Sequence, residues 1–183
     1  MTRLKLAAAL AIPMLMAGCS VPVAPYNANY ENVQLLKKAN DKVQLTSLSA
    51  ANSGLENISV RGSSFSSPYN GNMVNYIETA LRQELEKAGL MDPNSKKVLT
   101  ATVDKHNVDT GVDKGTGVIG ADVTITENGS TLYHKHVEAM TTWDSSFVGA
   151  IAIPNAAAAY PKLVQRFLHK LFSDQDFIAA LEH

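Results

Sequence analysis

Apolar and polar residues alternate along three stretches in the second half of the chain, a pattern typical of β-strands that bury one face. These stretches are 98–108, 117–126 and 131–143. Asn128-Gly129 stands between the last two, and an Asn-Gly pair between alternating runs is a strong signal for a β-hairpin. The glycine-rich segment 110–117 predicts a long hairpin loop between the first two. We therefore expect three consecutive antiparallel strands.

Two further stretches carry apolar residues at the three- and four-residue spacing of an amphipathic helix. The first is 72–88, and Gly89 stands where that helix would end. The second is 154–172, in which Pro154 suits a first helical turn. Pro161 lacks an amide donor and is expected to kink or restart this second helix.

The predicted elements occur in the order strands, helix, three strands, helix. Two short candidate strands, 43–48 and 58–61, precede the first helix, and Ser173 is a candidate N-cap for a short helix after the last one. We expect an α+β fold, a two-layer sandwich with two main helices on one face of an antiparallel sheet of about four to five strands. Residues 43–183 are expected to form this single domain.

The N-terminus has the layout of a bacterial export signal. Arg3 and Lys5 precede an apolar segment, 6–16, that is too short to span a bilayer. The following residues, Leu15-Met16-Ala17-Gly18-Cys19, resemble the lipobox of bacterial lipoproteins, with methionine where leucine is usual. The resemblance implies that residues 1–18 are a signal peptide and are cleaved.

Cys19 is the only cysteine of the chain, which makes a chance match less attractive than the lipobox interpretation. The resemblance implies a diacylglycerol and an N-acyl chain, such as palmitate, on Cys19. Ser20 stands where an aspartate would favour the inner membrane, so the resemblance implies the outer membrane, facing the periplasm. Residues 19–42 are predicted to be the lipidated cysteine and a tether, because their first part is rich in proline and asparagine. The alternative is a secreted protein with a free thiol.

Composition excludes several classes of protein. Sixteen basic and seventeen acidic residues give a net charge of -1, so there is no basic excess for a nucleic-acid partner. A mean hydropathy of -0.06 excludes a polytopic membrane protein. A single cysteine excludes an internal disulfide and a zinc cluster of several thiolates.

Two groups of residues suggest chemistry, and each also has a simpler interpretation. His134, His136 and Glu138 alternate on one predicted strand and so share a face, as metal ligands or as part of a solvated polar surface. Ser145 and Ser146 follow Asp144, but there is no Gly-x-Ser-x-Gly motif and no histidine tied to them. We favour the simpler interpretation in each case, a solvated polar surface for the first group and a turn capped by aspartate or serine for the second. We therefore expect no catalytic site, no metal and no cofactor beyond the acyl chains.

The stretch 147–153 contains seven residues without a charge. One interpretation is a hydrophobic surface that contacts a partner or lipid through Phe147, Val148, Ile151 and Ile153. The other is a buried edge strand or the packed start of the last helix.

The order of elements in 43–183 resembles a loose group of periplasmic lipoproteins. The pieces that carry the resemblance are Tyr76-Ile77-x-x-Ala80-Leu81-x-x-Glu84-Leu85 and Trp143-Asp144-Ser145-Ser146-Phe147. The group includes the lipopolysaccharide-assembly lipoprotein and the auxiliary lipoproteins of lipid ABC transporters. The resemblance implies a non-enzymatic accessory or adaptor in the cell envelope, with the membrane and an envelope protein as partners. The alternatives are a carrier of lipid or lipopolysaccharide and, ranked lower, a periplasmic hydrolase.

Overall fold

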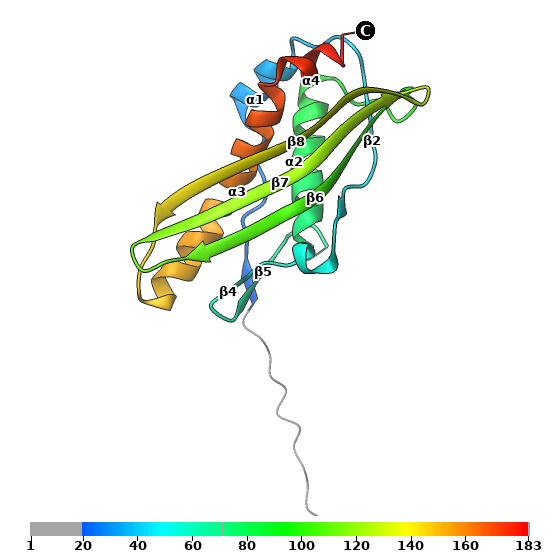
Figure 1. Ribbon diagram of the computed structural model, residues 1–183. Coiled ribbons are helices and arrows are strands. Elements are labelled where there is room, and N and C mark those ends of the chain that lie inside the picture. Colours follow the sequence, from blue (N-terminus) through cyan, green and yellow to red (C-terminus); the bar gives the residue numbers. More distant parts are fainter. Residues whose placement is uncertain (1–19, 71, 183) are drawn as a thin grey trace, which may run out of the picture.

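The computed structural model describes residues 20–70 and 72–182, and it confirms the α+β fold. Helices cover one face of the larger sheet (Figure 1). This sheet contains β2 (Gln44–Leu45), β3 (Ser49–Ala50), β6 (Lys97–Thr110), β7 (Lys114–Glu127) and β8 (Ser130–Asp144). The helices are α1 (Tyr30–Leu36), α2 (Met73–Ala88), α3 (Gly149–Phe172) and α4 (Gln175–Ala179), with a 3-10 helix η1 (Ser53–Glu56). A smaller sheet contains β1 (Ser20–Pro22), β4 (Ser59–Val60) and β5 (Ser63–Ser66).

Strands β6, β7 and β8 form the predicted antiparallel meander. The sheet as a whole is mixed, because β2 and β3 both pair parallel to the outer edge of β6. The loop between β6 and β7 has three residues, 111–113, and is much shorter than expected. Gly115 and Gly117 belong to β7, where their missing side chains leave room for Trp143 and Leu163. The glycines therefore signal close packing and not a long loop.

The helix α2 follows the sequence prediction closely. The side chain of Asn72 caps its N-terminus, and Gly89, with φ of 78°, ends it in the left-handed conformation. In contrast, α3 starts at Gly149, five residues before Pro154, and runs unbroken through Pro161. Asp174, and not Ser173, caps α4. No helix within the described residues has both the length and the apolarity needed to cross a membrane.

The core lies between the helices and the inner face of the sheet. Leu99, Ile119 and Ile125 of the sheet are fully buried, as are Leu85 of α2 and Leu163 of α3. An aromatic cluster extends the core toward the smaller sheet, since the rings of Tyr76, Tyr160 and Phe65 meet edge-on. Burial of this apolar surface is the main source of the fold's stability.

The segment expected to be a tether packs on the domain over its described part, 20–42. Strand β1 pairs parallel to β5, and Val23, Tyr26 and Leu36 are buried in the core. The prolines and asparagines of this segment cap and shape ordered structure; Asn29, for example, caps α1. Cys19 and the expected signal peptide lie outside the described residues.

Candidate functional site

The outer edge of the larger sheet is formed by β8, which spans fifteen residues. Among the described residues it pairs with β7 alone. An edge strand presents a row of unpaired N–H and C=O groups, and a further extended chain can add to it. The free edge of β8 is therefore the candidate site.

Two side chains from α3 show which backbone groups of β8 point outward. Lys170 donates to the carbonyl oxygen of Glu138 at 2.7 Å, and Asn155 donates to that of Asp144 at 3.2 Å. Because backbone groups alternate in direction along an antiparallel strand, those of Met140 and Thr142 also point away from β7. Met140 and Thr142 are both exposed, and Met140 is 60% exposed although it is apolar.

A row of basic side chains on the outer surface of α3 borders this edge. Lys162, Arg166, His169 and Lys170 are all exposed. Lys162 and Arg166 form no ion pair with any described residue. We call this row together with the free edge of β8 the edge groove.

The edge groove contains two adjacent hollows. One, of about 260 Å³, lies between 141–144 of β8 and the Asn155-to-Lys162 part of α3. The other, of about 440 Å³, lies between 138–140 and the Arg166-to-Ser173 part. A third hollow, of about 500 Å³, joins them, since Thr141 and Lys162 line it with the first and Arg166 and His169 with the second. The groove thus follows β8 from Glu138 to Asp144.

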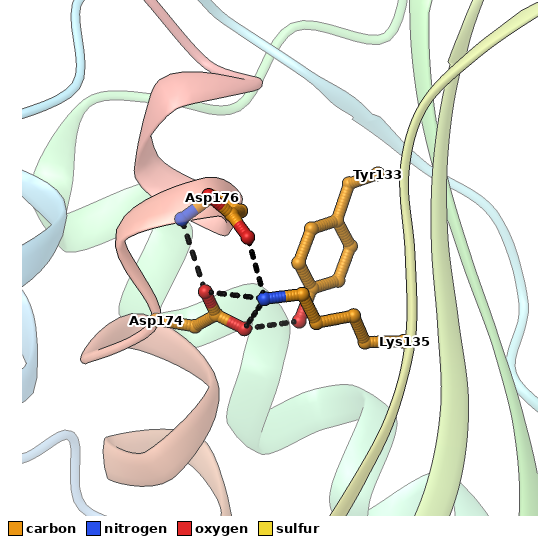
Figure 2. Close-up of polar contacts among 4 residues, drawn as sticks. All are labelled: Tyr133, Lys135, Asp174 and Asp176. Carbon is orange, nitrogen blue, oxygen red and sulfur yellow. Dashed lines mark hydrogen bonds and ion pairs between the residues drawn. The ribbon is translucent and has the colours of Figure 1, made fainter.

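A polar cluster fixes the far end of β8 against α4 (Figure 2). Lys135 donates to Asp174 at 2.9 Å and to Asp176 at 2.6 Å, and the hydroxyl of Tyr133 donates to Asp174 at 3.1 Å. Burial of Asp174 opposes its ionisation, but the hydrogen bonds from Lys135, the Asp176 amide and Tyr133 hold its pKa below the ordinary value. The cluster ties this end of β8 to the start of α4.

The apolar residues singled out in 147–153 lie beyond the other end of β8, around the start of α3. Phe147, Val148 and Ile151 are 80%, 51% and 52% exposed. Ile153 is half-buried and packs against the core. Three of the four residues are therefore exposed, and the stretch is not a buried strand.

The candidate catalytic residues are not brought together. Ser146 uses its hydroxyl to cap the amide of Val148 at 3.1 Å, and no described histidine forms a hydrogen bond with Ser145 or Ser146. Glu84, on the adjoining helix α2, is fully buried and is not part of a surface acid pair. It accepts hydrogen bonds from the N-terminal segment and acts as a structural anchor.

His134, His136 and Glu138 share the solvent face of the sheet but have different cross-strand partners. His134 forms a hydrogen bond with Thr124, and His136 forms one with Asp104. Glu138 forms a salt bridge with Lys105.

A different trio has ligand atoms close enough to hold a cation. Atoms of Asp104, Asp122 and His136 lie within 4.8 Å of one another, on three neighbouring strands. The register shift between Val103 and Lys105 places Asp104 at a β-bulge. All three side chains are exposed; a hydrogen bond of 3.1 Å joins His136 to Asp104, and Asp122 stands opposite His136 in the β7–β8 register.

Side chains fill the space between α3 and β7, where a carrier would need a cavity. A Cβ atom at Gly117 would lie 2.8 Å from Leu163 Cδ2, and one at Gly115 would overlap the indole of Trp143. The helix thus rests directly on the backbone of β7, and an acyl chain here would have to displace Leu163 or Trp143.

Comparison with known proteins finds likeness in structure alone. No known family model and no curated protein matches the sequence. A Xanthomonas campestris protein of the family DUF330 has a TM-score of 0.62 and 13% identity, over 87% of this chain and 96% of that one. A hypothetical protein from Chlamydia trachomatis has a TM-score of 0.50 and 10% identity, over 76% and 98%. A minor lipoprotein from Acinetobacter baumannii has a TM-score of 0.45 and 10% identity, over 75% and 92%. At these identities the first two show a shared fold and nothing more.

Proposed function

We propose that this protein is a lipid-anchored lipoprotein of the outer membrane, facing the periplasm, and that it acts without chemistry of its own. It serves as an accessory protein of the cell envelope that holds a partner at the membrane. The edge groove is the observation that carries this proposal. It offers an extended partner segment both backbone hydrogen bonds and basic side chains.

The chemistry of the groove defines the partner segment. The outward N–H and C=O groups of Met140 and Thr142 suit the addition of a strand. Lys162 and Arg166, free of ion pairs within the described part of the chain, favour acidic side chains on that strand. The partner is therefore a protein with an acidic extended segment.

A pair of substitutions at one position tests the edge. Thr142→Pro removes an outward N–H group, which an edge strand tolerates, whereas the matched control Thr142→Val keeps it. A photo-crosslinker at Met140 in living cells is expected to give one discrete protein adduct with Thr142→Val and at least about tenfold less with Thr142→Pro, as loss of a backbone contact predicts. Mass spectrometry should place the adduct next to acidic residues. Equal crosslinking in both variants would contradict strand addition.

The anchor is tested separately through Cys19. Cys19→Ala is expected to leave the domain folded, because Cys19 precedes every described element, but to remove the protein from the membrane fraction. Mass spectrometry of the N-terminal peptide should find the acyl chains on the wild-type protein. Normal recovery of Cys19→Ala with the outer membrane would contradict the proposed anchor.

A carrier of lipid or lipopolysaccharide is the second candidate. It requires the protein to open between α3 and β7, where Leu163 and Trp143 now fill the space. Native mass spectrometry of the purified protein distinguishes the two functions. Lipid bound in stoichiometric amount beyond the Cys19 acyl chains would place the carrier first.

A further inference from the structure

Exposed apolar side chains gather at one end of the molecule. Phe147, Val148 and Ile151 lie at the start of α3, and Val112, 59% exposed, lies in the loop between β6 and β7. We call these four residues the tip patch. All four are more than half exposed, and Phe147 reaches 80%. A cluster of exposed apolar side chains of this kind marks a contact with an apolar partner.

Arg61 holds the two loops of the tip patch together. Its guanidinium donates to the carbonyl oxygens of Phe147 at 2.7 Å, Ser146 at 3.0 Å, Thr110 at 2.9 Å and Gly111 at 3.3 Å. Four backbone acceptors are thereby satisfied next to the apolar side chains. This matters because unsatisfied carbonyl groups are costly in an apolar environment.

Charged residues form a rim beside the apolar residues. Lys114 pairs with Asp144, and Asp113 precedes Lys114 in the chain. The amide of Ser145 donates to the carbonyl oxygen of Asp113 at 2.9 Å, so the rim is tied to the same two loops. An apolar center with a charged rim suits the boundary between lipid headgroups and acyl chains.

The N-terminal end of the described chain lies at the same end of the molecule. Ser20 pairs with Ser64, and Ser64 follows the Arg61-Gly62 turn by two residues. One strand spacing and three residues thus separate Ser20 from Arg61, which places them at most about 15 Å apart. Figure 1 shows β1, the β4–β5 turn and the start of α3 at one end, with the β7–β8 turn at the opposite end.

We infer that the tip patch inserts into the membrane leaflet that holds the lipid of Cys19, so that the domain rests on the bilayer through two contacts. The inference depends on the proposed anchor. Because β1 begins at Ser20, a lipid on Cys19 is one residue away from ordered structure. The domain then stands against the membrane, with the tip patch toward the lipid and the edge groove open for the partner. A second contact also strengthens the first, because both act on the same body.

Fluorescence quenching tests the inference with the full lipidated chain. An environment-sensitive label is attached to Phe147→Cys, and to Ser130→Cys at the opposite end as the matched control. The lipidated Cys19 does not compete for the label. The proteins are placed in phosphatidylethanolamine–phosphatidylglycerol vesicles at one copy or fewer per vesicle. Quenchers on the acyl chains are expected to quench the label at position 147 at least about fivefold more than at 130, because quenching needs contact with the acyl region.

Equal quenching at both positions would overturn the inference. The inference would also be overturned if the emission of the label at 147 reported apolar surroundings but the acyl-chain quenchers did not quench it. A second copy or a partner protein would then cover the patch. The mass of the N-terminal peptide of the same sample shows whether Cys19 carries its acyl chains. An acylated protein with no quenching at 147 refutes the tip contact alone, whereas a protein without acyl chains refutes the proposed anchor.

Replacing the apolar side chains provides a second measurement. Phe147→Ser together with Ile151→Ser leaves the fold intact, because both side chains are exposed. A label at Val148→Cys is expected to lose most of its quenching in this background. Quenching that stays unchanged would show that the apolar side chains do not hold the tip in the bilayer.

Discussion

The hydroxyl of Tyr26 donates a hydrogen bond of 2.6 Å to the carboxyl group of Glu84, and both side chains are buried. The same carboxyl oxygen accepts the amide of Asn29 at 2.8 Å. Burial, followed by the hydrogen bond to Glu84, raises the pKa of Tyr26 far above its ordinary value, so the hydroxyl remains a donor. One buried carboxyl group on α2 thus holds the N-terminal segment on the domain, and with it the point to which the proposed anchor is attached.

Tyr26→Phe should therefore loosen the N-terminal segment. The ring keeps its packing, but a buried acceptor loses its shortest hydrogen bond, which costs about 1–2 kcal/mol. Urea denaturation measures the free energy of unfolding, and hydrogen exchange should rise in 20–36. Tyr30→Phe is the matched control. Because Tyr30 is 76% exposed, loss of its hydroxyl group should change the free energy of unfolding little. Equal stability of the two variants would show that the bond to Glu84 is not a significant anchor.

The close contact of α3 with β7 gives a prediction on packing. Gly117→Ala places a methyl group 2.8 Å from Leu163 Cδ2 and should destabilise the fold by about 1–3 kcal/mol through overpacking. Gly149→Ala is the control, because a Cβ atom there would lie 3.9 Å from its nearest neighbour, Ile153 Cδ1. Thermal unfolding compares the two. A fully stable Gly117→Ala variant would mean that space exists between helix and sheet, which would favour the carrier function.

The main helices and the meander could be predicted from the sequence because local signals define them. The spacing of apolar residues identified the two main helices, and Asn128-Gly129 identified the β7–β8 hairpin, where Asn128 adopts the positive φ of such a turn. The start of α3 was missed because a proline in the first turn is common, and nothing local indicates an extra turn before Pro154.

Long-range contacts account for the remaining differences. The segment 110–117 is rich in glycine, as loops are. Only the approach of Trp143 and Leu163 explains why Gly115 and Gly117 belong to a strand. The ordered N-terminal segment depends on Glu84, fifty-eight residues away from Tyr26 in sequence. The edge groove arises because β8 lies last in the sheet order, which periodicity alone does not predict.

The hydrogen bonds from Arg61 to the carbonyl groups of two loops are the basis of a third prediction. Arg61 and Gly62 have φ of 49° and 78°, as a two-residue hairpin turn with positive φ requires. Arg61→Asn suits that backbone but cannot reach the carbonyl groups of the neighbouring loops, so it isolates the effect of the guanidinium. We expect a loss of about 2 kcal/mol in the free energy of unfolding, and faster hydrogen exchange in 110–113 and 145–149. Unchanged exchange in these two loops would show that they hold their positions without Arg61.

A buried histidine predicts how stability depends on pH. The Nδ1 atom of His106 lies 2.8 Å from the carbonyl oxygen of Leu55, which can only accept, so Nδ1 carries the proton. The Nε2 atom then accepts from the hydroxyl of Tyr160 at 2.9 Å. Burial lowers the pKa of His106 to about 4, while the hydrogen bond to Leu55 opposes this shift.

The direction of this pH dependence follows from the protonation of His106 in the folded and in the unfolded chain. Well above pH 6.5 the imidazole is neutral in both the folded and the unfolded chain, and the fold keeps its full stability. Between pH 6.5 and pH 4 the unfolded chain binds a proton that the folded chain does not, so stability falls as the pH falls. His106 should account for up to about 3 kcal/mol of this loss. Urea denaturation across this range measures the free energy of unfolding. As the pH falls, this free energy should decline less steeply for His106→Gln, which cannot titrate, than for the control His134→Gln, which removes an exposed histidine. If both variants decline in parallel with the wild type, protonation of His106 does not limit the stability of the fold in acid.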